Sequence, residues 1–541
     1  MKKLFCFVLL LFVTIENYSQ SLQRPKLVVG VVVDQMRWDY LYRYYDRYAD
    51  NGGFKRMLNG GFSCENTMIP YVPTVTAPGH SCIYTGSVPA INGIAGNQWW
   101  DNELRRLVYC TEDKTVKTVG SNSTLGEMSP RNLLTTTIGD ELKLATNFRS
   151  KVIGIGIKDR GSILCAGHSA NAAYWYDNTN GHWISSTYYM SELPGWAKDF
   201  NSKKLADTYY QQGWNTLYPI NTYTQSTEDE NSFEGKIFGA DAKKFPYDLK
   251  KFIGKNYNII TNTPHGNTLT TEFAKAAINA EQLGADDITD FLMVGYSSPD
   301  HIGHAFGPNS IEQEDCFLRL DKELADLMNF LDSKIGKGQY LLFLSADHGV
   351  AQVPTFLKEN KIPAGNANLG SLARSLNEVL NEKFGRNDLV HGIYNSKVTL
   401  NRKLIDSLQL NIEQIKKAVI DHLIVQPAVA RAFDISKLRE TTLTEKEKNI
   451  VVNGYYPKRN GDIHIIIHPQ WLENFSGTGT THGTLNQYDA HIPLLWYGWG
   501  IKPGKLYREV YMTDITPTLA ALLHIQEPSG SVGHVINEIT D

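Results

Sequence analysis

The sequence predicts an α/β protein whose central sheet is mostly parallel and covered by helices. Three observations lead to this prediction. Several short runs are almost wholly apolar and end at turn residues, which is typical of strands buried on both faces. Segments with helical spacing of apolar residues lie between these runs. Alternation of the two patterns along a chain is characteristic of an open α/β sheet.

The predicted strands are spread along the whole chain. They are Leu27–Val33, Lys151–Ile157, Phe291–Tyr296, Tyr340–Leu344 and Leu494–Tyr497. Each run has the length of a strand and is too apolar to leave a face in water. We therefore expect them to lie in one sheet, in the parallel arrangement that such runs favour.

The clearest predicted helix is Ile311–Ile335, whose apolar residues recur at helical spacing. Ser310 and Gln313 form a capping-box pattern at its start. Residues 185–285 and residues 365–475 interrupt the rhythm of strands and helices. The first stretch is polar with weak periodicity, and the second carries helical patterns followed by a strand. We interpret both as insertions that decorate a core sheet, the second as a cap.

The N-terminus has the pattern of an export signal. Lys2 and Lys3 precede the apolar run Leu4–Val13, which is too short to span a bilayer comfortably. The alternative is a short membrane anchor, but the length and the flanking charges favour a signal peptide at residues 1–20. We expect the mature chain, residues 21–541, to be periplasmic or secreted and to have no membrane span, because no later stretch of about 20 apolar residues occurs.

Composition excludes several classes of protein. The chain has 541 residues, of which 42% are hydrophobic and 20% charged, and its net charge is −4. These values exclude a disordered, collagen-like or coiled-coil chain. The balanced charge argues against a nucleic-acid-binding protein, which needs a basic excess. No pair of cysteines has CxxC spacing, which argues against a zinc–thiolate site.

Acidic and imidazole side chains follow three of the predicted strands. They are Asp34, Asp300, His304, Asp347 and His348. In open α/β sheets, ligands bind outside the carboxyl ends of the strands, so we expect these side chains to meet at one edge. Carboxylates and imidazoles without thiolates suit Zn²⁺ in a hydrolytic site, with Mn²⁺ or Co²⁺ as weaker alternatives.

The spacing of these residues limits how they can bind a metal ion. Asp300 and His304 are four residues apart, so on a helical turn they share a face and can hold one ion. Asp347 and His348 are adjacent, so binding the same ion requires an irregular loop, which Gly349 would permit. A single Asp or His of this kind is more often a capping or loop residue. Five such residues at the ends of predicted strands make a shared metal site the favoured interpretation.

The segment Pro73–His80 places a hydroxyl at a predicted helix start. Pro78 suits the first turn of a helix, which puts Thr76 beside free N–H groups and the positive end of the helix dipole. A hydroxyl there can act as a metal-activated nucleophile on a phosphoryl group. The alternative is a threonine that only caps the helix, which is the commoner role of such a residue taken alone.

Together these segments resemble the alkaline phosphatase superfamily. The residues that carry the resemblance are, in chain order, Asp34, Thr76-Ala77-Pro78-Gly79-His80, Pro299-Asp300, Gly303-His304, Ala346-Asp347-His348-Gly349 and Thr481-His482-Gly483. The tail Asp514–Leu519 is similar to the closing helix of that superfamily. The resemblance covers nearly the whole mature chain, implies a three-layer sandwich, and is greatest for the phosphate-insensitive periplasmic alkaline phosphatases.

The resemblance implies two Zn²⁺ ions per chain. One would be bound by Asp300, His304 and His482, and the other by Asp34, Thr76, Asp347 and His348. It also implies that Asn97, Lys158 and Arg160 bind the phosphoryl oxygens, with Lys158 where other members hold Mg²⁺. Taken alone, Asn97 would be a turn residue and the other two a solvated basic loop. We expect structural or surface roles for His80, His168, His301 and His468.

The implied function is hydrolysis of a broad range of small phosphate monoesters through a phosphothreonine at Thr76. The alternative within the superfamily is a nucleotide pyrophosphatase/phosphodiesterase, which shares the metals, Thr76 and Asn97 but normally lacks the pair Lys158 and Arg160. An exported zinc-binding protein without activity is a third interpretation. The chain lacks the Cys/Ser-x-Pro-x-Arg motif of sulfatases. We expect a monomer with no nucleic-acid partner.

Overall fold

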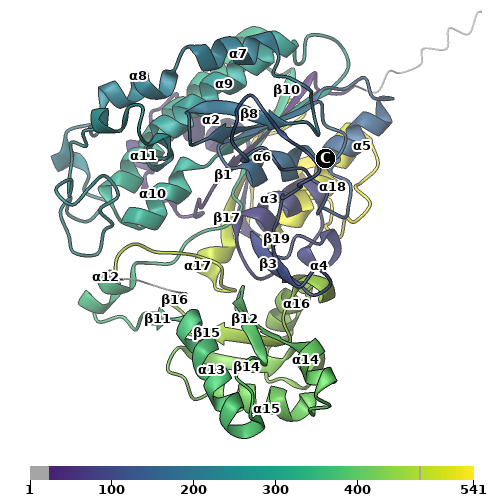
Figure 1. The fold of residues 1–541 in the computed structure, drawn as a ribbon. Helices are drawn as coiled ribbons and strands as arrows, with labels where there is room; N and C mark the ends of the chain where they lie inside the picture. The colour runs from purple at the N-terminus through teal and green to yellow at the C-terminus, as the bar shows by residue number, and fades with distance from the viewer. Residues whose placement is uncertain (1–22, 474–476, 541) are drawn as a thin grey trace, which may run out of the picture.

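A large mixed sheet forms the centre of the protein in the computed structural model, which describes residues 23–473 and 477–540 (Figure 1). The middle of this sheet is parallel and buried. Its strands are, in spatial order, β10 (Tyr340–Ser345), β1 (Leu27–Val33), β9 (Asp290–Tyr296), β6 (Val152–Gly156) and β7 (Ala172–Asp177). The four predicted strands before residue 345 are therefore confirmed, to within one or two residues at their ends.

Both flanks of the sheet contain antiparallel strands. β17 (His491–Gly498) lies beside β10 with Trp496 opposite Phe343, and runs antiparallel both to β10 and to β2 (Phe62–Met68). The parallel arrangement predicted for the run Leu494–Tyr497 is wrong, because an apolar run reports burial on both faces and not strand direction. The remaining strands are β8 (His182–Ser186), β5 (Thr118–Val119), β18 (Gly504–Leu506) and β19 (Val510–Tyr511).

Helices cover both faces of the sheet, which confirms the three-layer sandwich. One layer contains α2 (Gly53–Gly60), α9 (His265–Glu281), α10 (Ser298–Phe306) and α11 (Ile311–Leu331). The other contains α3 (Thr76–Thr85), α5 (Ile138–Ala145), α6 (Asp159–Ala166) and α18 (Ile515–Leu523). Among the described helices, none is long and apolar enough to cross a membrane. The described cysteines are all buried and free.

Helix α11 is shorter than predicted and is capped in part as predicted. It ends at Leu331, and a π-helical turn, Asp332–Gly336, follows it. The Ser310 hydroxyl accepts a hydrogen bond from the Gln313 backbone N–H at 3.1 Å. The Gln313 side chain does not complete a capping box, because its Nε2 donates to the Pro299 carbonyl at 3.1 Å. This bond ties the start of α11 to α10.

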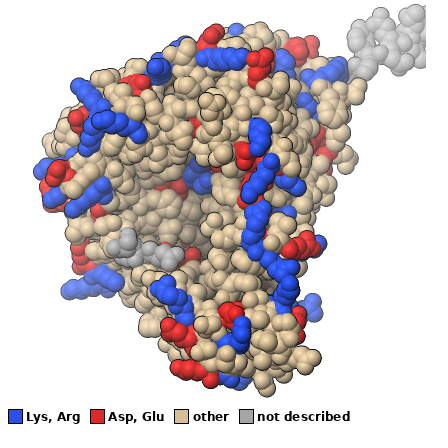
Figure 2. All heavy atoms as spheres, viewed as in Figure 1, with Lys and Arg blue, Asp and Glu red and all other residues tan. Residues whose placement is uncertain are grey.

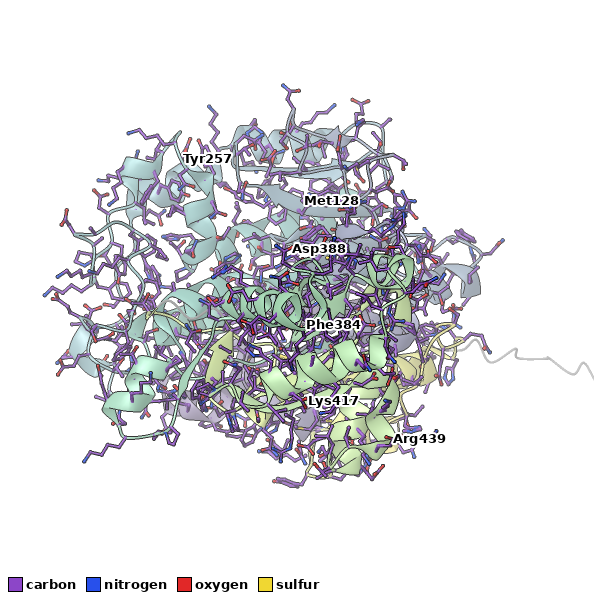
Figure 3. The ribbon with its side chains drawn as sticks, turned by 60° about the horizontal axis from the view of Figure 1, so that its bottom comes forward. Met128, Tyr257, Phe384, Asp388, Lys417 and Arg439 are labelled. Atoms are coloured by element: carbon purple, nitrogen blue, oxygen red, sulfur yellow. The ribbon has the colours of Figure 1, made fainter. Side chains whose placement is uncertain are left out.

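Residues of the predicted cap form a separate lobe below the sheet in Figure 1. Its strands β12 (Val390–Tyr394), β13 (Lys397–Leu400), β15 (Ile463–Ile467) and β14 (Val429–Asp434) make an antiparallel sheet. Helices α13 (Leu369–Phe384) and α15 (Ile412–Leu423) pack on it around a hydrophobic core of their own. Figure 3 brings this lobe forward, with Phe384 on α13 and Lys417 on α15.

The lobe begins and ends at paired strands. β11 (Gly365–Ala367) runs parallel to β16 (Trp471–Glu473), so the chain leaves and returns at one place. Residues 185–285 contain α7 (Gly195–Ser202), α8 (Leu205–Gln212) and also α9, which packs on β9 of the main sheet. Division of the chain into a core with two insertions stays a prediction. The predicted signal peptide, residues 1–20, lies outside the described residues.

Candidate metal centre

Asp300, His304 and His482 converge at the carboxyl end of the sheet. Asp300 lies in the first turn of α10, and His304 follows one helical turn later, as the four-residue spacing predicts. Oδ1 of Asp300 is 3.1 Å from Nε2 of His304 and 3.6 Å from Nε2 of His482. One ligand atom from each of these residues lies within 4.8 Å of the others, so together they could hold one metal ion.

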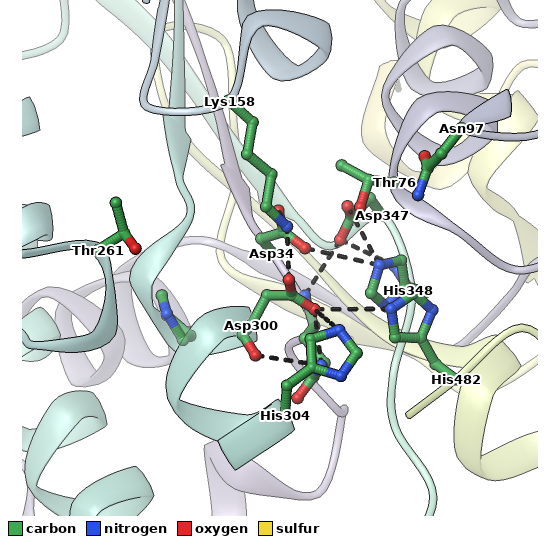
Figure 4. A network of polar contacts seen from close by, with 12 residues as sticks. Asp34, Thr76, Asn97, Lys158, Thr261, Asp300, His304, Asp347, His348 and His482 are labelled. Atoms are coloured by element: carbon green, nitrogen blue, oxygen red, sulfur yellow. Dashed lines mark hydrogen bonds and ion pairs between the residues drawn. The ribbon is translucent and has the colours of Figure 1, made fainter. Parts of the chain in front are cut away.

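Asp34, Asp347 and His348 form a second group beside the first. Asp34 directly follows β1, and the other two residues lie in the irregular segment after β10 that the sequence requires for joint ligation. Nε2 of His348 is 3.5 Å from Oδ1 of Asp34 and 3.5 Å from Oδ2 of Asp347. The rings of His348 and His482 stack with centroids 3.5 Å apart, so the two groups are neighbours (Figure 4).

Backbone carbonyls orient all three histidines. Nδ1 of His304 donates to the Thr480 carbonyl, at 2.8 Å, and Nδ1 of His482 donates to the Thr74 carbonyl, also at 2.8 Å. Nδ1 of His348 donates to the Gly349 carbonyl at 2.9 Å. A carbonyl can only accept, so each Nδ1 carries a proton and each Nε2 faces the site, where the neutral ring offers a lone pair. Burial lowers the pKa of His348 and that of His482, which favours the neutral form of these two rings. Burial also lowers the pKa of His304, but the neighbouring Asp300 carboxylate raises it by more.

The donor set fits divalent cations. Oδ1 of Asp34 and Nε2 of His348 are buried and have no hydrogen-bond partner within residues 23–473 and 477–540. Burial raises the pKa of Asp34 well above its ordinary value, and the carboxylates of Asp300 and Asp347 raise it further. A buried cluster with excess negative charge and free nitrogen and oxygen ligands is what a divalent cation would neutralise.

Thr76 lies at the start of helix α3, next to the second group. It is the first residue of α3 and is 1% exposed. Gly79 lets this helix approach the metal ligands, because a Cβ at that position would lie 2.4 Å from the Asp347 carbonyl oxygen. Figure 4 shows Thr76 beside Asp347, with Asn97 on its far side. The Oδ1 of Asn97 accepts a hydrogen bond from the Ala77 N–H at 2.8 Å, which leaves the Asn97 amino group free to donate.

Lys158 and Arg160 lie at the junction of β6 and α6. β6 ends at Gly156, two residues before Lys158, and Arg160 is in the first turn of α6. The Lys158 ammonium bridges carboxylates of Asp34, at 2.6 Å, and Asp300, at 2.5 Å (Figure 4). Both cations line one cavity, and they are not the solvated loop residues that their sequence context alone would suggest.

This cavity is about 410 Å³ in volume and has an aromatic wall. Tyr109, Trp175 and Tyr176 contribute to it, and Nη1 of Arg160 donates to the Tyr109 hydroxyl at 3.1 Å. In the space-filling view, Figure 2, the face of the molecule is hollowed between the main body and the lobe.

Two further residues support the metal ligands: Gln35, which was not predicted, and His80, for which only a structural or surface role was predicted. Gln35 donates from its backbone N–H to Oδ1 of Asp347 at 3.1 Å and from Nε2 to Oδ1 of Asp300 at 2.6 Å, so it spans both groups. His80 is buried, with Nδ1 3.0 Å from the Thr76 carbonyl and 3.2 Å from Oδ2 of Asp347. Its position four residues after Thr76 on a predicted helix was the one available signal. Gln35 had none, because its contacts are far away in the sequence.

The fold and the site define an α/β protein with two adjoining groups of candidate metal ligands and a buried hydroxyl at the start of a helix beside them. The chain belongs to the type I phosphodiesterase/nucleotide pyrophosphatase family, whose model matches residues 28–488. This assignment places the metal-ligand groups, up to His482, inside the matched region.

Relatives and solved structures extend the likeness to nearly the full length. The chain is 54% identical to alkaline phosphatase PhoV of Synechococcus elongatus, over 96% of this chain and 94% of that protein. It is 53% identical to a protein of Myroides odoratus named calcium-transporting ATPase, over 96% of this chain and 95% of that protein. The crystal structure of wild-type alkaline phosphatase PafA matches with a TM-score of 0.94 and 50% identity, covering 96% of this chain and 99% of that one.

Proposed function

We propose that this chain is a zinc-dependent phosphomonoesterase that releases inorganic phosphate from a broad range of small phosphate monoesters. One observation carries the proposal: two metal-ligand groups adjoin at the edge of the sheet, beside a buried threonine at a helix start and a lysine and an arginine that line one cavity. PhoV and PafA, which share half or more of their residues with this chain, are both named alkaline phosphatases.

The metal ligands would divide between two Zn²⁺ ions. Asp300, His304 and His482 would hold one ion, and Asp34, Asp347 and His348, with the Thr76 hydroxyl, the other. Carboxylate and imidazole ligands without thiolate support zinc for these sites. Bound zinc supplies a lowered pKa for a coordinated hydroxyl and stabilises negative charge on the departing oxygen.

The reaction would proceed in two displacements at phosphorus. The Thr76 oxygen attacks the phosphoryl group in line, the bond to the alcohol oxygen breaks, and the alcohol leaves with a proton. Water then attacks the phosphothreonine, the bond to the Thr76 oxygen breaks, and phosphate is released. Transfer of a phosphoryl group passes through a loose transition state, so the side chains contribute mainly by placing charge around the three other oxygens.

Three side chains would bind those oxygens. Lys158 remains charged although burial lowers its pKa, because the carboxylates of Asp300 and Asp34 raise it by more. Arg160 offers a planar fork for two oxygens, and Asn97 offers the amino group that Ala77 leaves free. Two cations at the phosphoryl group favour a monoester dianion over a diester monoanion, which supports the phosphomonoesterase over the phosphodiesterase alternative.

The site of action would be outside the cytoplasm, in the periplasm or the medium. The pattern of residues 1–20 supports this proposal. A phosphatase of broad specificity in that location would scavenge phosphate. The chain would be able to act as a monomer, because one chain supplies every ligand of both proposed metal sites.

A side-by-side assay tests the proposal. The purified full chain is supplied with an aryl phosphate and with a diaryl phosphate, and its zinc content is measured on the same sample. We expect kcat/KM to favour the monoester, about two zinc ions per chain, and loss of both activities in Thr76→Val, which removes the hydroxyl at nearly constant volume. A preference for the diester, or full activity of Thr76→Val, would contradict the proposal.

A further inference from the structure

The lobe contacts the segment that carries Asn97. The turn between β12 and β13 contains Asn395, whose Nδ2 donates to the Gln98 carbonyl at 2.9 Å. The approach is close: a Cβ at Gly96 would lie 2.5 Å from that Nδ2. Asn97 lies between these two contact points. The lobe therefore touches the backbone on both sides of a proposed phosphoryl-binding residue.

The contact continues along β3 (Gln98–Asp101), the strand that follows Asn97. The Trp100 ring stacks on His391 of the lobe, with centroids 4.2 Å apart and planes at 23°. Beyond the strand, the Asn102 N–H donates to the Lys458 carbonyl at 3.0 Å. Contacts with the lobe thus recur along this segment, through the Gln98 carbonyl, the Trp100 ring and the Asn102 N–H.

The other side of the same segment faces the nucleophile. Oδ1 of Asn97 accepts from the N–H of Ala77, the residue after Thr76, and its backbone carbonyl accepts from the Cys110 N–H at 3.0 Å. The segment from Gly96 to Gln98 is therefore held between helix α3 and the lobe. Removing the lobe contact would leave Asn97 attached on one side and free to shift on the other.

We propose that Asn395 is a positioning residue that holds Asn97 in place for the phosphoryl group, so that the lobe contributes to turnover without touching the substrate. This inference rests on the proposed function of Asn97. The position of a binding group matters because a displacement of about 1 Å can lower the rate of the catalysed reaction strongly.

A double-mutant cycle tests the inference in the full chain. Asn395→Gly is the suitable variant, because Asn395 has a φ of 50°, where glycine is unstrained and alanine is not. We expect Asn395→Gly to lower kcat/KM for an aryl phosphate about tenfold, as loss of one hydrogen bond can do, and to cause no further loss in an Asn97→Ala background. Equal losses in both backgrounds would overturn the inference.

The matched control is Asn377→Gly, which removes the side chain that bonds both the N–H and the carbonyl of Val390 inside the lobe. We expect it to lower the unfolding temperature but leave kcat/KM unchanged. If it lowers kcat/KM as much as Asn395→Gly does, the effect is general to the lobe and the inference fails. His391→Ala, which removes the Trp100 stack, should reproduce the non-additivity with Asn97→Ala and serves if Asn395→Gly does not fold.

Amide hydrogen exchange separates this inference from the proposed function, because it needs no activity. We expect the peptide that contains residues 96–101 to exchange faster in Asn395→Gly than in wild type or Asn377→Gly. Unchanged exchange there would overturn the inference. Faster exchange in a chain that hydrolyses no phosphate ester would uphold the contact and refute the proposed function alone.

Discussion

Replacement of Arg160 by alanine should impair monoester hydrolysis far more than diester hydrolysis. Arg160 is half-buried, its Nε has no hydrogen-bond partner in the described part of the chain, and it faces the same cavity as Lys158. Burial lowers its pKa, but Tyr109 and Asp159 raise it by more, so the side chain stays a cation. A monoester dianion carries one more negative charge than a diester at the reacting phosphoryl group.

The size of the difference follows from that extra charge. One additional unit charge about 4 Å from a guanidinium is worth about 4 kcal/mol at an effective dielectric constant of about 20. Solvent reaches Arg160, and screening reduces this to about 2 kcal/mol. Since about 1.4 kcal/mol corresponds to tenfold, Arg160→Ala should lower kcat/KM roughly thirtyfold more for the monoester than for the diester.

The assay compares kcat/KM on an aryl phosphate and on the methyl ester of the same aryl phosphate, for wild type and variant. Arg160→Lys is the control, because it keeps the charge and loses the fork; it should retain most of the preference for the monoester. Losses of equal size on the two substrates for Arg160→Ala would refute the assignment of Arg160 to the phosphoryl oxygens.

Three further outcomes are expected. Chelation should abolish activity, and zinc titrated back should saturate at two ions per chain in wild type but at one in Asp300→Ala, as measured by elemental analysis; a single site in wild type would contradict the two-metal arrangement. Burial, helped by the neighbouring acids, raises the pKa of Glu234 to about 9 and that of Glu312 to about 8, so both hold protons in the folded state that the unfolded chain releases in the ordinary carboxyl range. The stability that these two protons give the folded state is complete at pH values below the ordinary carboxyl range and is lost as the pH rises to about 9. Glu312→Gln should therefore flatten the fall of the unfolding temperature with pH. An unchanged slope would exclude Glu312 as a source of that fall. Leu327→Ala, at a fully buried position of α11, should lower the free energy of unfolding by about 2–5 kcal/mol without changing kcat, and a smaller loss in denaturant titration would mean that the core closes around the gap.

Local patterns predicted much of the fold. β1 has the predicted boundaries, and β6, β9 and β10 differ from theirs by one residue at one or both ends, because continuous apolar runs are a property of neighbouring residues. The direction of β17 was not predictable in this way, since it depends on which strand it pairs with. The capping box predicted at Ser310 forms only in part for a similar reason, because the Gln313 side chain donates a hydrogen bond to α10.

For the candidate site too, contacts between residues close in sequence were predictable and contacts between distant residues were not. Asp300 and His304 share a helical face, so their proximity follows from spacing alone. His482 needed the family resemblance, because nothing near it in the sequence marks a ligand. Gln35 was missed altogether, although it contacts both groups, because its partners lie more than 250 residues away in the chain.

The stereochemistry at phosphorus tests the central claim, attack by the Thr76 oxygen, most directly. The measurement uses an aryl phosphate made chiral with oxygen isotopes and follows phosphoryl transfer to an alcohol acceptor. Two in-line displacements, first by Thr76 and then by the acceptor, predict retention of configuration. Inversion would mean a single direct displacement and would contradict the role of Thr76 as nucleophile.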